Sequence, residues 1–274
     1  MFWPSYHADF AFFSQSGERG REIGNIIALD SLLTILGPVV SGLVVALFGF
    51  PGLFALLCIV VILSNVPFFL AKEQFTPSDL SYTAAYRALV AKENRRYFFG
   101  YLGFGEELIV LTVWPIFVYL TFNNVFSTGF VAAVSTLITS LVLLYVGRAS
   151  DLRNRKGILR IGSVFTVLSW LMRIVARGGA GVFLVDFFSR TSRNILMLPL
   201  LSGLYEYASK TAVVRTVIFF EMSLTVGKLF ASGLMAVVFF FFPTGYGLAF
   251  FIAALFSLCY LFLSAKTHKP VVAA

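Results

Sequence analysis

The sequence predicts an all-α membrane protein, a bundle of about eight full transmembrane helices and one partial helix. Three observations lead to this fold class. Hydrophobic residues make up 59% of the chain and charged residues only 12%, about half of the roughly 25% that soluble domains carry. Long apolar runs fill most of the sequence. These runs do not alternate apolar with polar residues, which favours helices over a β-barrel.

Eight apolar runs are long enough for a helix to cross the roughly 30 Å hydrocarbon core of a bilayer. They cover residues 27–49, 53–71, 97–122, 125–146, 158–176, 181–206, 212–241 and 244–265. The apolar stretch that opens the chain rises only about 20 Å as a helix, which is too short to cross. We therefore expect the chain to begin partway through a span of a longer protein.

Lysine and arginine residues gather on alternate connections between these runs. The rich set comprises residues 14–26, 72–96, 147–160, 206–215 and the tail after 264. The connections that alternate with these contain a single basic residue, Arg177. The positive-inside rule places the rich set and the C-terminus in the cytoplasm of a multi-pass cell-membrane protein. The net charge of +8 is therefore a signal of topology, and we expect the lipid bilayer and no nucleic acid as a partner.

The long polar connection divides the chain into two helical parts. We expect residues 1–71 to be the last half of an N-terminal bundle, 72–96 a cytoplasmic linker, and 97–274 a complete six-helix bundle. A shift of 191 residues supports this division, since it places Asp30 on Glu221 and residues 41–43 on 232–234, both Ser-Gly-Leu. Duplicated bundles around a midplane site are a common plan of transporters.

The run 181–206 carries three charges on one helical face. Asp186, Arg190 and Arg193 stand at positions i, i+4 and i+7, which share a face of a helix. One charge at the bilayer centre costs at least about 2.5–3.5 kcal/mol. Two interpretations remain open: the charges line a solute pathway, or they staple helices together as ion pairs.

Other apolar runs supply candidate partners for these charges. From depth along the helices we expect Asp186 to pair with Lys228, and Glu221 to pair with Arg193 or Arg190. Four internal acids against three bases leave one acid over, which suits a proton carrier. The predicted substrate and coupling cavity comprises Glu106, Glu107, Asp186, Arg190, Arg193, Glu221 and Lys228.

A loop between two later spans carries the most specific motif. Gly147, Asp151, Arg155 and Lys156 match a G-x-x-x-D-R-x-G-R-K pattern, and here the chain resembles the major facilitator superfamily. Leu152 stands where that family usually has a basic residue. The resemblance implies a cytoplasmic gate loop and a two-bundle transporter from which the first three helices are missing.

A second partial match lies in the run 27–49. Gly37, Pro38 and Gly42 resemble part of a G-P-x-x-G-G signature of proton-exchanging members of that family. Small residues let helices approach closely, and Pro38 would kink the span. Close packing is sufficient to explain the pattern, so it indicates exchange for protons only weakly.

These features predict a secondary transporter that moves a small polar or charged solute by alternating access, with protons as the candidate coupling ion. No phosphate-binding loop, nucleophile elbow, zinc motif or paired C-x-x-C occurs, so we expect no cofactor, no metal and no enzymatic activity. Two alternatives remain open. The same charged cluster could serve a membrane-embedded enzyme or lipid-handling protein, or a sensor or scaffold that transports nothing.

Overall fold

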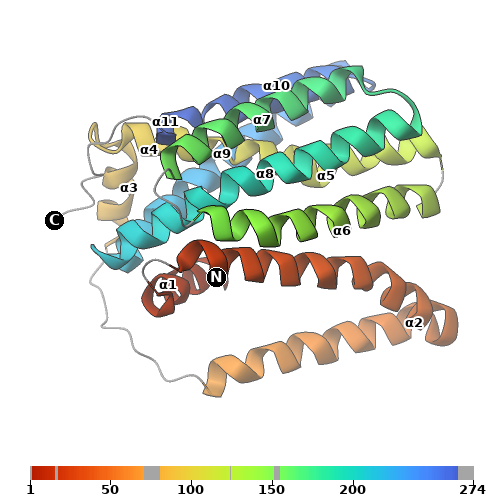
Figure 1. Ribbon diagram of the computed structural model, residues 1–274, viewed down its shortest axis with the longest axis horizontal. Coiled ribbons are helices and arrows are strands. Elements are labelled where there is room, and N and C mark those ends of the chain that lie inside the picture. The colour runs from red at the N-terminus through yellow and green to blue at the C-terminus, as the bar shows by residue number, and fades with distance from the viewer. Residues whose placement is uncertain (1, 16–17, 71–80, 124, 151–154, 265–274) are drawn as a thin grey trace.

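The computed structural model describes residues 2–15, 18–70, 81–123, 125–150 and 155–264, and that part of the chain contains helices and no strands (Figure 1). The all-α prediction is therefore confirmed. Five segments are long and apolar enough to cross a membrane, which supports a membrane-spanning bundle. They are Leu43–Pro67, Arg95–Phe122, Arg155–Val175, Val213–Phe241 and Tyr246–Ser264. The predicted number of eight full spans stays a prediction.

The described part of the chain contains eleven helices. In chain order they are α1 (Phe2–Phe13), α2 (Arg19–Leu70), α3 (Tyr82–Val90), α4 (Arg95–Leu102), α5 (Gly105–Phe122), α6 (Val125–Ser150), α7 (Arg155–Val175), α8 (Gly178–Ser209), α9 (Val213–Phe241), α10 (Tyr246–Leu258) and α11 (Leu261–Ser264). The polar connection contains the short helix α3. The Ser81 hydroxyl caps it by accepting a hydrogen bond from the Ala84 N–H at 3.2 Å, which satisfies one free donor at its start.

The long helix α2 is a hairpin of two arms, residues 19–48 and 50–70 (Figure 1). Gly49 makes the reversal with a φ of 67°, a conformation that only glycine adopts without strain. The first arm packs against α6 and α8. The second arm exposes Phe54, Ile62 and Phe69, and none of the most apolar window of Leu43–Pro67 is buried among the described residues.

Two buried apolar clusters form the core. One contains Leu196, Val217 and Phe220, and the other contains Ile109 and Val182. The first cluster also includes Ala11 of α1 and Ile23 of α2. Helices α8 and α9 each contribute to both clusters, and so does the α4–α5 segment, with Phe104 in the first cluster and Ile109 in the second. All three segments carry charged residues between their two contributions. The fold therefore places a layer of charge across the middle of an apolar bundle.

Close helix contacts at glycines set the spacing of this layer. A Cβ on Gly105 would lie 2.7 Å from the carbonyl oxygen of Gly227, and one on Gly227 would lie 2.6 Å from that of Leu102. The α4–α5 junction and α9 thus touch backbone to backbone. On the other side, a Cβ on Gly162 of α7 would lie 2.7 Å from the amide nitrogen of Leu196 in α8.

Candidate functional site

Three helices meet at Arg193. Its guanidinium, from α8, donates hydrogen bonds to two adjacent acids of α5. Nη1 donates to Glu106 Oε1, and Nη2 donates to Glu107 Oε1 at 2.7 Å. Glu107 Oε2 also accepts from Lys228 Nζ of α9 at 2.6 Å. We call these four side chains the central network. The contact between Gly105 and Gly227 holds α5 against α9, and each acid or lysine lies within two residues of one of these glycines.

A second group of polar contacts extends from the central network toward α7. Asp186 accepts from Arg190 Nε at 2.7 Å and from the Trp114 indole Nε1–H at 2.7 Å. The Trp170 indole donates to Glu106 Oε2 at 2.9 Å. Each of the two most buried acids therefore has one arginine and one tryptophan as donors, which compensates for the loss of water around it.

Arg173 of α7 completes this second group, and sequence reasoning missed it. Its guanidinium carbon lies 3.8 Å from the centroid of the Trp170 ring and 4.4 Å from that of Trp114, a stacked cation–π geometry. Its Nη2 donates to the Ser189 hydroxyl at 2.7 Å. The available signal was an arginine inside an apolar run, three residues after a tryptophan.

Both predicted pairings are wrong. Asp186 pairs with Arg190 on its own helix, and Lys228 pairs with Glu107. Glu221 contacts His7 of α1 instead of an arginine, at 3.3 Å between Oε1 and Nε2. Depth along a helix was the only sequence information. Rotation about the helix axis brings the α5 acids between α8 and α9 and turns Glu221 toward α1.

The count of internal charges omitted Arg173, which raises the bases to four, but Arg173 donates to Ser189 and one of the four acids is still left without an arginine or lysine partner in the described part of the chain. Glu221 has no arginine or lysine within ion-pair distance among the described residues. His7 also lies 2.5 Å from the Tyr205 hydroxyl, measured from Nδ1. His7 is buried, so this contact joins the short α1 to α8 and α9 through a titratable group.

The charged layer has a closed side and an open side. The side chains of Glu106 and Asp186 are 1% and 4% exposed, whereas those of Lys228 and Arg190 are 36% and 37% exposed. Arg193 and Glu107 lie between these limits. All seven predicted cavity residues carry charged contacts, and six of them form two linked groups through α5, α8 and α9.

A cavity of about 340 Å³ lies elsewhere, at the end of the bundle that the positive-inside rule predicts to be cytoplasmic. None of the seven predicted residues lines it. A water-filled chamber beside the central network therefore stays a prediction.

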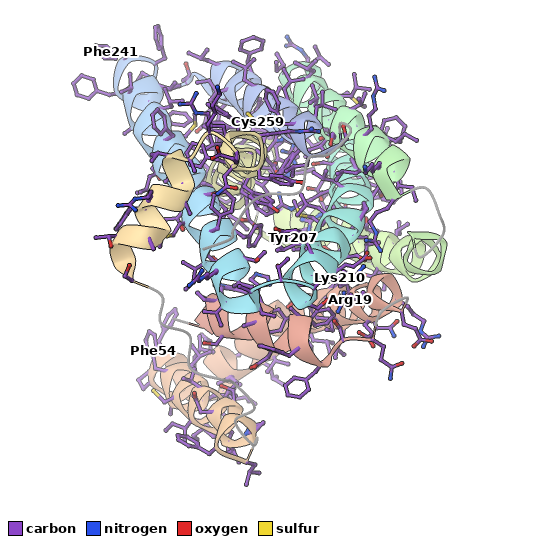
Figure 2. All side chains as sticks on the ribbon, turned by 90° about the vertical axis from the view of Figure 1, so that its left-hand side faces the viewer. Arg19, Phe54, Tyr207, Lys210, Phe241 and Cys259 are labelled. Carbon is purple, nitrogen blue, oxygen red and sulfur yellow. The ribbon has the colours of Figure 1, made fainter. Side chains whose placement is uncertain are left out.

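The predicted gate loop is only partly described. Asp151 lies outside the described residues, and Gly147 belongs to the backbone of α6 without described surroundings. Arg155 donates to Glu206 of α8, which also accepts from Lys210 at 2.6 Å. Figure 2 shows this end of the bundle, with Tyr207 and Lys210 near Arg19 of α2. The hydrogen bonds from Lys210 and Arg155 lower the pKa of Glu206 from 4.5 to about 2.

The packing motif gives a further correction. A Cβ on Gly37 would meet nothing within 4 Å, so no helix of the described part approaches closely there. The surroundings of Pro38 and Gly42 lie outside the described residues. Among the described residues, no group of three His, Cys, Asp or Glu side chains is placed to hold a metal.

The arrangement defines a class, a membrane-spanning helical bundle with a charged layer in its apolar interior. No protein-family model matches the chain, and no curated protein sequence matches it significantly. The resemblance to the major facilitator superfamily therefore rests on the loop and glycine–proline motifs alone.

Proposed function

We propose that this chain belongs to a secondary transporter that moves a small polar or charged solute across the membrane by alternating access. The central network is the observation that carries the proposal. Ionised side chains in the membrane interior normally mark a solute or ion pathway. Ion pairs that only hold helices together would be fully buried, whereas the side chains of Lys228 and Arg190 are more than one-third exposed.

The open side of the charged layer is the proposed solute site. Arg190 and Arg193 present guanidinium groups, which bind carboxylates and phosphates with two parallel hydrogen bonds. A solute anion would compete with Asp186 for Arg190 and with Glu107 for Arg193. Lys228 would then keep Glu107 charged and paired while the solute is bound.

The contact between His7 and the pair Tyr205 and Glu221 is the proposed moving contact. It joins α1, from the first part of the chain, to α8 and α9 of the later part. Alternating access requires contacts between two bundles that form in one state and break in the other. Protonation of His7 or Glu221 would change this contact, which provides a route for coupling to protons.

Transport by the reconstituted chain tests the proposal. The chain would be placed in liposomes, and uptake of radiolabelled monocarboxylates, dicarboxylates, phosphate, amino acids and sugars would be measured at pH 6 and pH 8. We expect one anionic class to be taken up, and Arg190→Ala and Glu106→Gln to reduce that uptake. Lys92→Gln, on an exposed residue outside the charged layer, is the matched control.

The outcomes separate the proposal from its alternatives. Unchanged uptake in both site variants would refute the site assignment. No uptake of any class above empty liposomes, with chain that remains folded, would favour a sensor or scaffold. Chemical conversion of an added compound would favour a membrane-embedded enzyme.

A further inference from the structure

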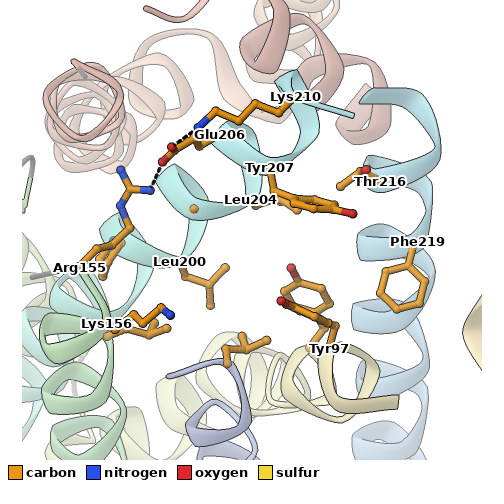
Figure 3. A pocket seen from close by; sticks show the side chains of 15 residues that line it. Tyr97, Arg155, Lys156, Leu200, Leu204, Glu206, Tyr207, Lys210, Thr216 and Phe219 are labelled. Atoms are coloured by element: carbon orange, nitrogen blue, oxygen red, sulfur yellow. Dashed lines mark hydrogen bonds and ion pairs between the residues drawn. The ribbon is translucent and has the colours of Figure 1, made fainter. Parts of the chain in front are cut away.

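The cavity near the start of α7 lies away from the charged layer. The cavity of about 340 Å³ is lined by α4, α7, α8, α9 and α11 at the end of the bundle where α7 begins and α8 ends (Figure 3). Its lining residues are Tyr97, Tyr101, Arg155, Lys156, Leu159, Pro199, Leu200, Gly203, Leu204, Glu206, Tyr207, Lys210, Thr216, Phe219 and Leu263. None of them belongs to the central network.

The lining divides into an apolar wall and a polar rim. Leu159, Leu200, Leu204, Phe219 and Leu263 supply aliphatic and aromatic surface from four helices. The rim carries three bases and one acid, and tyrosine and threonine residues add hydroxyl groups to the lining. A site with this division suits a ligand that has one apolar end and one polar end.

The net positive charge of the rim favours an anionic ligand. Its bases are Arg155, Lys156 and Lys210 and its acid is Glu206, so the lining carries a net charge of +3 − 1 = +2. The N-terminus of the 21-residue helix α7 adds partial positive charge at the same place. In Figure 3 the Lys156 amine is directed toward the interior of the cavity, while Arg155 and Lys210 both reach Glu206.

The volume limits the apolar end. Ligand pockets usually measure roughly 300–1,000 Å³, so a cavity of about 340 Å³ is at the small end of that range. One unbranched chain of moderate length fits such a space, whereas the two acyl chains of a phospholipid do not. The side chains around the cavity are mostly half-buried or buried, so the site exists without rearrangement.

We propose that this cavity binds a single-chain anionic amphiphile, a carboxylate or phosphate group on one apolar chain, with the anionic group at Lys156 and Lys210 and the chain against Leu200, Leu204 and Phe219. The site is independent of the proposed solute pathway. Because Arg155 and Lys156 belong to the predicted gate loop, the ligand would bridge the start of α7 to α8 and α9.

Photolabelling of the full chain tests this site. The chain would be reconstituted in phosphatidylcholine nanodiscs and labelled with dodecanoate that carries a photoreactive diazirine near its tail, and labelled peptides would be located by mass spectrometry. We expect labelling at α8 and α9 beside the cavity. Labelling of the exposed second arm of α2 measures the background from probe that is dissolved in the lipid and not bound in the cavity.

Two variants with matched controls sharpen the test. Gly203 lines the cavity, and a Cβ there would have only Arg155 Cδ within 4 Å, at 3.9 Å, so Gly203→Leu fills the space without a backbone clash. We expect it to abolish cavity labelling, whereas Gly233→Leu, at a glycine with open space around it, leaves it unchanged. Lys156→Gln removes one charge-assisted contact and should weaken labelling about tenfold, while Lys92→Gln should not.

Competition identifies the recognised group. Unlabelled dodecanoate or dodecyl phosphate should displace the cavity label, and dodecanol and inorganic phosphate should not, because each of these lacks one of the two ends. Stronger competition by dodecyl phosphate would indicate a lysolipid-like headgroup, and stronger competition by dodecanoate a free fatty acid. Equal competition by dodecanol, or cavity labelling that survives Gly203→Leu in a folded chain, would overturn the proposal.

Discussion

Glu106 and Glu107 are neighbours in the sequence, yet they occupy different environments in the same ion network. Glu106 is 1% exposed and receives hydrogen bonds from Arg193 and the Trp170 indole. Glu107 is 24% exposed and shares its charge between Arg193 and Lys228, which is about one-third exposed. One acid therefore anchors the network to the closed side, where Arg173 and both tryptophans pack, and the other faces the open side.

The difference in exposure suggests different roles for the two acids, one in holding Arg193 in place and the other in exchanging partners with a solute. A buried pair is difficult to break, since removal of one partner leaves a charge without water. A partly exposed pair breaks easily, since water or a ligand replaces the lost partner. The closed side should therefore set the geometry of Arg193, and the open side should exchange partners with a solute.

Loss of the closed-side acid should have the largest effect. Glu106→Ala leaves the Trp170 indole and one arm of Arg193 without their buried acceptor, which should cost about 3–5 kcal/mol of stability. Thermal unfolding of the chain in nanodiscs measures this change. A loss no larger than that of Glu107→Ala would contradict the distinction between the two sides.

Loss of a tryptophan donor should have an intermediate effect. Trp114→Phe keeps an aromatic ring near Arg173 but removes the N–H that serves Asp186, so the buried carboxylate loses one of its two donors. We expect a stability loss of about 1.5–3 kcal/mol, the range for hydrogen bonds to charged groups. If Trp114→Phe unfolds at the temperature of the parent chain, Asp186 is not held by this contact.

Loss of the open-side base should affect function more than stability. Lys228→Gln removes an ion pair that is one-third exposed, so it should change stability by less than about 1 kcal/mol. Uptake of the transported solute into liposomes should nevertheless fall several-fold, because Glu107 loses one of its two partners. Lys92→Gln serves as the control, and equal uptake by both variants would remove Lys228 from the site.

The smallest expected effect is at Glu206 and depends on pH. Its pKa is lowered from 4.5 to about 2 by hydrogen bonds from Lys210 and Arg155, so its ion pairs stabilise the folded chain at pH values above about 4.5. That contribution is lost as the pH falls from 4.5 toward 2. The difference in unfolding temperature between the parent and Glu206→Gln should therefore shrink across this range. A constant difference would contradict the assignment.

The sequence predicted the helical class and the positions of the internal charges, because hydropathy and the high energy of buried charge are properties of single residues. It did not predict which charges pair, since pairing depends on rotation about each helix axis. The backbone contact of Gly105 with Gly227 determines that rotation for Glu107 and Lys228, and nothing in the local sequence indicates which distant glycine is the partner.

Two further contacts were missed for the same reason. Arg173 sits near the end of an apolar run, and its position between two tryptophans depends on how α5 and α7 both pack against α10. The contact of His7 with Tyr205 and Glu221 joins residues about 200 positions apart.

Cysteine labelling tests the central claim most directly, because it does not require the solute to be known. With Cys58 and Cys259 replaced by alanine, Lys228→Cys and Leu229→Cys would be treated in intact membranes with a charged, membrane-impermeant thiol reagent. Leu229 is the adjacent, exposed apolar residue of α9 and would face lipid. Since only a thiol in contact with water ionises and reacts, Lys228→Cys should react at least about tenfold faster than Leu229→Cys. Equal, slow labelling at both positions would mean that the charged layer has no access to water.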